Sequence, residues 1–500
     1  MATTNDLYHS YKNHMSRVAD IRYASAVLQW DQETYLPPKS AITRGQQIAT
    51  LSELAHQEFT DEKLGDLLKE LGQRSDLPEN EKKNIELTTE DYNKNKKYSS
   101  AFVRRMSEQV NKTFHAWIES RKQNSFAIFE KDLATLVQLK KEETDILGYK
   151  DHPYNSLLNE FEKGSTVELL DKTFKSLLPE LKNLLDRIME KPQVNDSFLH
   201  LHYPKQLQWD WGMELIRDLH FDFDAGRQDL SEHPFTINFS NADVRITTRV
   251  NENNFSSMTW SCIHETGHAL YEQGLPADQY GVPLGEPASL GVHESQSRLW
   301  ENNAGRSISF WKHYFPRLQQ HFPAQLGGIS LEEFYKGINK VAPSFIRTEA
   351  DELTYHFHVY IRYQLEKNLI DGTIETNDIP AFWNDNYKKY LGVQVTNDQQ
   401  GCLQDIHWSH GSFGYFPTYS LGSFYAAQYF TAAGNQIGDI SQQLEKGNSQ
   451  SLLWWLRENI HRHGRKYTSE ELCQKITGKT LDTRDFMSYL LQKYTMIYNL

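Results

Sequence analysis

The sequence predicts a mainly helical protein with one small β-sheet, and two changes of pattern along the chain support this fold class. Over most of residues 5–225, apolar residues recur three and four positions apart, as amphipathic helices require. Between residues 233 and 255, apolar and polar residues alternate instead, with many Thr, Val, Ile and Phe residues, which is typical of strands. Helical spacing then returns and continues to the carboxyl end.

Proline and glycine place the breaks in the first helical region. The segment YLPPKS at residues 35–40 interrupts a helix, because proline removes a backbone donor and clashes with the preceding turn. Gly148 and the pair Lys191-Pro192 mark two further helix ends. The first 225 residues are therefore expected to form several long helices.

The rest of the chain contains the expected sheet and a second set of helices. The strands are predicted to turn at Ser240-Asn241, and a long helix is expected from Thr348 to about Leu369. Two glycine-containing stretches, residues 274–291 and 411–423, are predicted to be ordered loops. No repeat, low-complexity tract or charged tail divides the chain.

Length and charge limit the classes of protein that fit this sequence. The 500 residues, of which 38% are hydrophobic, can bury a large core. We expect one domain over residues 1–500, with a helical part at about 1–225, a sheet-containing part at about 226–305 and a second helical part at about 306–500. The net charge of −13 argues against nucleic acid and against an anionic membrane surface as partners, because both attract basic surfaces.

Cysteine content and the amino terminus indicate a cytoplasmic protein. The three cysteines, Cys262, Cys402 and Cys473, are odd in number and far apart, so they predict neither a disulfide framework nor a metal clip. The chain opens without the basic start and apolar stretch of a secretion signal.

The segment HETGH carries the strongest chemical signal. On a helix, positions four apart lie on one face, so His264 and His268 can both direct a ring nitrogen at one metal ion. Glu265 lies beside that ion and is placed as the general base that takes a proton from an activated water molecule. The alternative interpretation is an ordinary helix with two histidines and no ion.

A catalytic zinc site needs a third protein ligand, and Glu294 is the candidate because it lies on the next helical pattern. Its alternative is a solvated helix charge, while His293 and Glu301 are either outer partners of the ligands or surface groups. Gly267 is unfavourable inside a helix, so we expect another segment to approach it closely. Gly274 is expected to end the helix in a left-handed cap.

With these residues in place, the sequence resembles the carboxypeptidase Taq family of zinc metallocarboxypeptidases. The resemblance covers nearly the whole chain, and it rests on the motifs LQWDQETYLPP (28–38), HPF (233–235), DVRIT (243–247), HETGH (264–268), HESQSRLWEN (293–302), IRTEAD (346–351), GCLQDIHW (401–408) and WLRENIHRHGR (455–465).

The resemblance implies a single peptidase domain with a helical, saddle-like fold, a deep active-site groove and a small sheet beside the metal-binding helix, usually as a homodimer. It implies His264, His268 and Glu294 as ligands of one divalent ion, which is expected to be Zn²⁺ with Co²⁺ as a substitute, and Glu265 as general base. The activity it implies is removal of single residues from peptides with a free carboxyl terminus.

Such an enzyme must also recognise the free carboxylate and stabilise an oxyanion. Arg347 is the first candidate for a bidentate carboxylate clamp, and Arg245 is the second, with a structural ion pair to Asp243 as its alternative. His407 and Tyr419 are candidate oxyanion donors, and otherwise belong to a packed aromatic loop. His233 is expected in the substrate-binding region or as a brace of the strands.

Two other functions remain open from the sequence. A helical zinc oligoendopeptidase shares the HETGH helix and the distant glutamate, but it also cleaves peptides with an amidated carboxyl end. A non-catalytic scaffold stabilised by a metal ion is the second, although structural zinc sites have four protein ligands and no idle base beside them.

Overall fold

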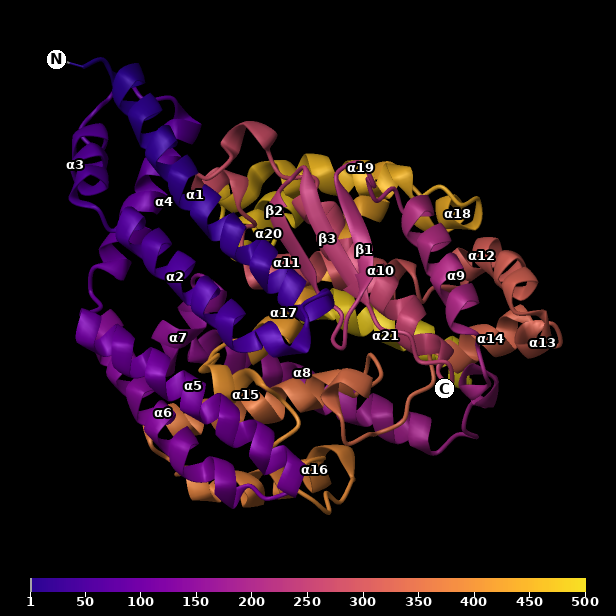
Figure 1. Cartoon of the computed structure of the whole chain (residues 1–500). Helices are drawn as coiled ribbons and strands as arrows, with labels where there is room; N and C mark the ends of the chain where they lie inside the picture. Colours follow the sequence, from indigo (N-terminus) through magenta and orange to yellow (C-terminus); the bar gives the residue numbers. More distant parts are fainter. Residues whose placement is uncertain (1) are drawn as a thin grey trace. The chain divides into compact units, whose positions relative to one another are not determined.

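The computed structural model describes residues 2–500, which form two compact units built from interleaved stretches of chain (Figure 1). Unit 1 contains the residues up to Lys96 together with Asn195–Ile338 and Tyr429–Thr480, and unit 2 contains Lys97–Val194, Asn339–Gln428 and Leu481–Leu500. Most of the chain is helical and one sheet has three strands, so the predicted fold class is confirmed. The expectation of a single domain over the whole chain stays a prediction.

Unit 1 begins with four helices whose ends follow the predicted signals. Thr3 caps the first helix through a reciprocal pair of hydrogen bonds with Asp6, and the helix ends directly before the proline-containing segment 35–40. Tyr11 and Leu64 lie in the apolar core that these helices share. The four helices are α1 (Thr4–Thr34), α2 (Ala41–Phe59), α3 (Glu62–Leu71) and α4 (Glu79–Asn95).

The sheet of unit 1 consists of β1 (Gly226–Leu230), β2 (Thr236–Ser240) and β3 (Asp243–Thr248) in the order β1-β3-β2. β2 and β3 are antiparallel and joined by the tight turn that the sequence predicts, whereas β1 runs parallel to β3. β1 lies just before the alternating stretch, and the sequence pattern does not predict it because its five residues, GRQDL, contain a single apolar side chain.

The two faces of the sheet carry different side chains. Val244 and Ile246 of β3 pack with Met258 and Cys262 of α10 (Phe255–Glu272) in one apolar cluster. Successive strand residues point to opposite faces, so Arg245 points away from α10. In Figure 1 the strands pass in front of α10, which agrees with the contacts of β2 and β3 with that helix.

α10 lies against α11 (Leu290–Arg298), which continues as a π-helical turn over Leu299–Ala304. A Cβ atom on Gly267 would lie 2.6 Å from the Cα atom of Ser297 in α11, which confirms the predicted close approach. Gly274 has no left-handed backbone, so that prediction is wrong. Its hydrogen instead faces the ring of His461, where a Cβ atom would lie 2.5 Å from Nδ1.

Unit 1 contains further helices, of which α9 (Lys205–Asp218) contacts α10 directly. His461 belongs to the last stretch of the unit, and its Nε2 lies 2.9 Å from Oε1 of Gln296 in α11. The other helices are α12 (Ile308–His321), α13 (Pro323–Leu326), α14 (Leu331–Ile338), α18 (Ile440–Glu445), α19 (Gln450–Asn459) and α20 (Ser469–Thr477).

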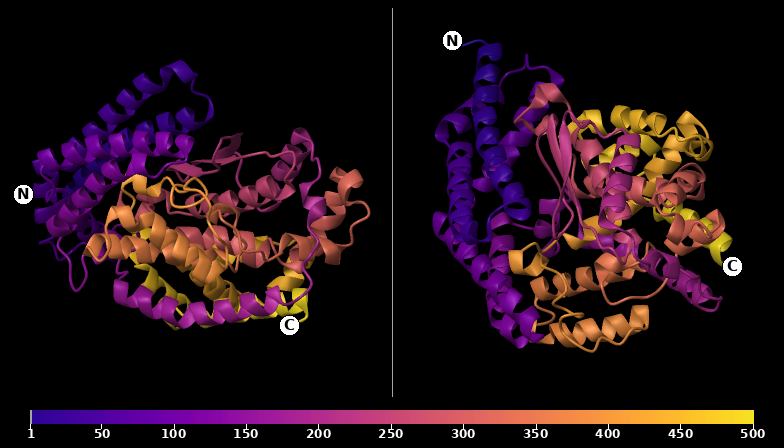
Figure 2. Two further views of the ribbon diagram at one scale, coloured as in Figure 1. Left: turned by 90° about the horizontal axis from the view of Figure 1, so that it is seen from below. Right: turned by 45° about the vertical axis from the view of Figure 1, so that its right-hand side comes forward.

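Unit 2 is helical, and its long helices α5 and α6 run alongside each other in Figure 1 and in the right-hand view of Figure 2. Helix α17 (Phe416–Ile437) begins in unit 2 and ends in unit 1. The others are α5 (Ser100–Gln123), α6 (Ala127–Leu147), α7 (Tyr154–Phe161), α8 (Val167–Met189), α15 (Tyr355–Asp371), α16 (Ile379–Leu391) and α21 (Thr483–Tyr498).

Two helix starts differ from the prediction. The helix expected from Thr348 begins at Tyr355, because the Asp351 carboxylate accepts the backbone N–H of Leu353 and of Thr354 and so caps a turn before it. The predicted loop 411–423 is helical from Phe416 onward, since Pro417 suits the first turn of a helix. No helix within residues 2–500 combines the length and apolar character that a membrane span requires.

Candidate active site

Two adjacent helices of unit 1 bring the three predicted metal ligands together. His264 and His268 lie on one face of α10, and their Nε2 atoms are 3.8 Å and 3.5 Å from Oε2 of Glu294 in α11. Glu294 is buried, and all three ligand atoms lie within 4.8 Å of one another.

The outer nitrogen of each histidine is engaged by another side chain. His264 Nδ1 lies 2.8 Å from Oε2 of Glu301, so it donates its proton to that carboxylate. His268 Nδ1 lies 2.5 Å from Nδ1 of His293. These contacts leave both Nε2 atoms turned toward Glu294, as a carboxylate–histidine–metal arrangement requires.

Arg298 fixes the orientation of the glutamate. Its Nε donates to Oε1 of Glu294 at 2.6 Å, and its Nη1 donates to Oε2 of Glu301 at 3.1 Å. Glu301 is carried by the π-helical turn, a form of helix that occurs often at functional sites. Oε1 of Glu294 is thereby held by the guanidinium, and Oε2 is directed at the two histidines.

This donor set fits a divalent cation. Three lone-pair atoms, two imidazole nitrogens and one carboxylate oxygen, converge at a point where a cation is the partner that satisfies all of them. Two histidines and one glutamate are the ligands of a catalytic zinc site with one open position. The residues present therefore fit the divalent ion that the sequence predicts.

The pKa shifts of His268 and Glu294 favour the metal-binding protonation states, whereas Glu294 and Glu301 outweigh burial and raise the pKa of His264. Burial lowers the pKa of His268 to about 3, with the neighbouring His293 acting in the same direction, so this imidazole is neutral. Burial alone would raise the pKa of Glu294, but Arg298 and the two histidines outweigh it and hold that pKa far below its usual range. His268 and Glu294 are thus ready to bind a metal at neutral pH.

Glu265, the predicted general base, is held by the sheet. Thr236, at the start of β2, donates from Oγ1 to Oε2 of Glu265 at 2.6 Å. Burial raises the pKa of the Glu265 carboxyl, and the nearby His264 opposes that rise. A raised pKa brings a carboxylate closer to the working pH of a general base.

Arg347 lies in a second cluster, in unit 2, where two buried arginines share one buried carboxylate. Arg347 donates from Nε to Oδ1 of Asp405 at 3.0 Å, and Arg362 donates from Nε to Oδ2 at 2.6 Å. Arg347 also donates from Nη1 to the hydroxyl of Tyr355. The side chains of both arginines are at most 7% exposed, so this cluster carries one buried positive charge in excess.

His407 and Tyr419 are neighbours in the same cluster. His407 Nε2 lies 3.1 Å from the Tyr419 hydroxyl, and the Arg347 guanidinium lies 4.7 Å from the centre of the Tyr419 ring. Burial, reinforced by Arg347, lowers the pKa of His407 to about 3, so its imidazole is neutral. The structure therefore groups Arg347, His407 and Tyr419 within unit 2.

Arg245 lies on the sheet face away from α10, and His233 lies in the exposed segment before β2. Arg245 forms two hydrogen bonds of 2.9 Å with Asp243, and its guanidinium lies 4.4 Å from the ring centre of Trp30, on the sheet face opposite α10. His233 is exposed just before β2, and its carbonyl accepts a hydrogen bond from Ser231. The structure thus gives Arg245 the ion pair that the sequence offered as its alternative.

Sequence reasoning missed three residues of the metal centre: Thr236, Glu272 and Arg298. Arg298 had a detectable signal, because it stands four positions after Glu294 and three before Glu301, within reach of both on a helix. Thr236 gave no such signal, since Glu265 lies in another element, and Glu272 shows only its spacing of four after His268, because its partner His293 lies in α11.

Comparison with known proteins places the chain in a family. The model of the carboxypeptidase Taq (M32) metallopeptidases matches residues 10–494. Carboxypeptidase 1 of Bacillus subtilis (strain 168) is 36% identical over 496 residues, covering 98% of this chain and 99% of the relative. Thermostable carboxypeptidase 1 of Thermus thermophilus is 37% identical over 510 residues, covering 99% of this chain and 100% of the relative.

A solved structure agrees. The crystal structure of the M32 carboxypeptidase from Deinococcus radiodurans R1 superposes with a TM-score of 0.97 at 37% identity, covering 99% of this chain and 100% of the other. By sequence and by fold, this chain is a hydrolase that belongs to the carboxypeptidase Taq (M32) family of metallopeptidases.

Proposed function

We propose that this enzyme removes single residues from the carboxyl end of peptides, with one zinc ion held by His264, His268 and Glu294 and with Glu265 as general base. The observation that carries the proposal is the convergence of three lone-pair atoms beside a buried carboxylate that holds no ligand position. When bound there, the ion lowers the pKa of a water molecule and polarises the scissile carbonyl. Co²⁺ suits the same ligands.

Glu265 moves the proton in this scheme. Its carboxylate takes a proton from the attacking water and later delivers it to the leaving amine. Thr236 restricts the side chain by its hydrogen bond to Oε2, which leaves Oε1 for the proton. The raised pKa of Glu265 supports both steps. It makes the carboxylate a stronger base toward the water, and it keeps the proton on the carboxyl until the proton is transferred to the amine.

Arg347 is proposed to bind the terminal carboxylate of the substrate. An excess buried guanidinium charge is unfavourable until an anion compensates it, and a substrate carboxylate supplies that anion. Asp405 and Tyr355 engage Nε and Nη1 of Arg347, which leaves Nη2 for the substrate. Specificity for free carboxyl ends follows from this charge.

His407 and Tyr419 are proposed to stabilise the oxyanion of the tetrahedral intermediate. The neutral state of His407 allows Nε2–H to donate to the Tyr419 oxygen, and that polarises the tyrosine hydroxyl as a donor. A donor aimed at a developing oxyanion lowers the barrier by on the order of 3 kcal/mol. Arg245 and His233 keep a proposed role in substrate contact at the sheet, secondary to Arg347.

Two further expectations complete the proposal. The three cysteines are buried thiols with no disulfide among residues 2–500, which supports a reducing, cytoplasmic compartment. The enzyme is proposed to act as a homodimer, which light scattering coupled to size-exclusion chromatography tests directly.

The test of function is hydrolysis of one mid-length peptide in two forms, with a free and with an amidated carboxyl end. Zinc-loaded protein is expected to release single residues from the free form alone. The Glu265→Gln variant is expected to lose about 10²–10⁴-fold in kcat, because it lacks the base. Glu332→Gln, an exposed helix position in α14, is the matched control and is expected to keep full activity.

The other outcomes point to the alternatives. Internal cleavage of both peptides would assign the enzyme to the oligoendopeptidase type. Absence of cleavage by fully zinc-loaded protein would leave the metal-stabilised scaffold. Full activity of Glu265→Gln would overturn the proposed mechanism.

A further inference from the structure

One more acidic side chain lies on the metal-binding face of α10. Glu272 stands four positions after His268, as His268 stands four positions after His264, so the three side chains follow one face of the helix. Glu272 is 5% exposed, and the proposed reaction does not use it. A buried carboxylate needs hydrogen-bond partners, and one partner of Glu272 in turn contacts a proposed metal ligand.

Glu272 connects to His268 through His293. Oε1 of Glu272 lies 2.7 Å from Nε2 of His293, and Nδ1 of His293 lies 2.5 Å from Nδ1 of His268. His293 directly precedes the third ligand, Glu294, in α11. The ring of His293 is therefore held between two residues of α10 while its backbone belongs to the helix that carries the glutamate ligand.

The hydrogen bonds that link His268, His293 and Glu272 can all donate in one direction, toward Glu272. A carboxylate accepts, so His293 Nε2 carries a proton and donates it to Glu272. When His293 is a neutral imidazole, its Nδ1 is an acceptor, and His268 Nδ1 is then the donor. A neutral His268 with its proton on Nδ1 has its lone pair on Nε2, which is the atom that faces Glu294.

The far end of the chain is anchored on the sheet. Asn238 of β2 donates from Nδ2 to Oε2 of Glu272 at 2.8 Å, so both carboxylate oxygens are engaged.

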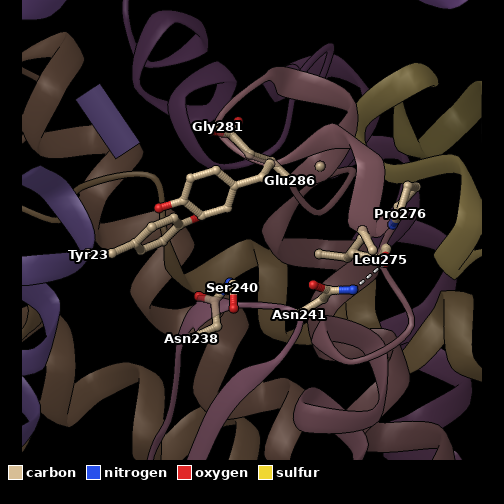
Figure 3. A pocket seen from close by; sticks show the side chains of 11 residues that line it. Tyr23, Asn238, Ser240, Asn241, Leu275, Pro276, Gly281 and Glu286 are labelled. Atoms are coloured by element: carbon tan, nitrogen blue, oxygen red, sulfur yellow. Dashed lines mark hydrogen bonds between the residues drawn. The ribbon is translucent and has the colours of Figure 1, made fainter. Parts of the chain in front are cut away.

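Figure 3 shows Asn238 on the wall of a small polar pocket with Tyr23, Ser240 and Glu286. The pocket has a volume of about 20 Å³, enough for roughly one water molecule. The anchor thus comes from a strand rather than from a mobile surface side chain.

From this geometry we infer that Glu272 and His293 are positioning residues that fix the tautomer and ring orientation of His268 for metal binding. The inference rests on the metal site proposed above. The two histidine ligands are then supported differently: His264 reaches a carboxylate directly, in Glu301, whereas His268 reaches one through a second imidazole. Glu272 acts on the ion through His293 and not by contact.

The experiment measures zinc affinity of the full-length protein by competition with a chromophoric chelator. Glu272→Leu and His293→Phe are each expected to weaken zinc binding by about 10–100-fold, the usual effect of losing an outer partner of a ligand. The double variant is expected to bind zinc with an affinity within about threefold of that of the weaker-binding single variant, because both changes interrupt the same series of hydrogen bonds. Glu272→Gln keeps an acceptor for His293 and is expected to restore most of the affinity.

Controls separate positioning from general damage to the fold. The controls are His313→Phe in α12 and Glu445→Leu in α18, which make the same substitutions at other sites of unit 1. His313 is partly buried and Glu445 is paired with Lys312, and neither belongs to the hydrogen bonds from Glu272 to His268. Both variants are expected to bind zinc as the wild type does. The absorption spectrum of the Co²⁺-loaded protein gives a second readout, since a reoriented His268 changes the ligand field. His293→Phe is expected to change that spectrum.

The outcomes distinguish this inference from the metal assignment. Unchanged affinity and an unchanged Co²⁺ spectrum in His293→Phe, or additive losses in the double variant, would overturn the positioning role. If Glu272→Leu does not fold, Glu272→Gln and His293→Phe still decide it. If His268→Ala binds zinc as tightly as the wild type, the proposed metal site itself is wrong.

Discussion

At the residue scale, the guanidinium of Arg347 offers the most specific test of substrate recognition. Arg347→Lys keeps the charge but loses the planar fork that matches a carboxylate, so kcat/KM for a free-ended peptide is expected to fall by about 10–100-fold. The loss should appear mainly in KM, because the carboxylate is bound in the ground state as well as in the transition state. Steady-state kinetics over a range of peptide concentrations measures both parameters.

A matched arginine makes this result interpretable. Arg317 in α12 is likewise held by ion pairs, in its case with the two carboxylates of Asp218 and Glu214. Arg317→Lys is expected to leave kcat/KM unchanged. Equal losses in both variants would mean that Arg347 matters for folding and not for the substrate.

Single residues could be predicted from sequence where the geometry is local. The spacing of His264 and His268 fixes their common face through the helix itself, and the sequence therefore predicts this pair. The partners that orient them depend on packing between elements: Thr236 comes from a strand and His293 from the next helix. No spacing along the chain reports such distances.

At the element scale, the approach of α10 to α11 depends on Gly267. Gly267→Ala would place a methyl group 2.6 Å from the Cα atom of Ser297, so the two helices must move apart. We expect a loss of about 1–3 kcal/mol in unfolding free energy and weaker zinc binding, because the ligands are divided between these helices. Thermal unfolding and chelator competition measure both effects.

Gly45→Ala is the control for this prediction. Gly45 lies inside α2, and no neighbouring atom lies within 4 Å of the position that the new methyl group would occupy, so the change adds helix propensity without a clash. A gain of up to about 1 kcal/mol is expected. Similar behaviour of the two glycine variants would show that the helix contact is not tight.

The buried carboxyl group of Glu366 in α15 holds the loop after α16 by hydrogen bonds, and its titration can be measured. Glu366 accepts hydrogen bonds from Tyr154, from Nε1 of Trp408 and from the backbone of Gly414, and burial raises its pKa to about 7. A carboxyl with a raised folded pKa stabilises the protein below its unfolded pKa, and that stabilisation is lost as pH rises through the folded value.

Glu366→Gln removes this titration. Between pH 8 and pH 5.5 the wild type is expected to gain about 2 kcal/mol of unfolding free energy relative to the variant, from the linkage of proton binding to folding. Urea denaturation of both proteins at the two pH values measures the difference. A constant difference across this range would show that Glu366 is ionised throughout.

Elements with a clear period could be predicted, and elements set by capping or by neighbours could not. The helix breaks at residues 35–40 and Gly148 follow from proline and glycine chemistry that acts locally. The late start of α15 depends on the Asp351 side chain, which competes with the helix for backbone donors. β1 is specified by its parallel partner β3 rather than by its own composition.

At the scale of the whole molecule, metal binding should stabilise the fold. An ion that binds the folded protein and not the unfolded chain adds about 4 kcal/mol at a thousandfold excess over its dissociation constant. Treatment with a chelator is expected to lower Tm by several degrees, and zinc is expected to restore it. His268→Ala, which lacks one ligand, should show the low Tm with or without zinc.

The division into two units could not be predicted from the sequence. The chain leaves unit 1 after Lys96, after Ile338 and after Thr480, and no composition change marks these points. A boundary of this kind is defined by contacts between distant stretches, which local periodicity does not encode. The predicted parts, split near residues 225 and 305, follow changes of pattern along the chain instead.

Interleaving has a consequence for how the enzyme is made. The metal-binding helices α10 and α11 are synthesised before His461, which lies against Gly274 and Gln296 and is translated only after helices α12 to α19. The ribosome must therefore release the chain as far as His461 before this support can form. A nascent chain stalled before His461 contains every proposed zinc ligand but lacks the packing behind them, which makes maturation of the centre a late event in biosynthesis.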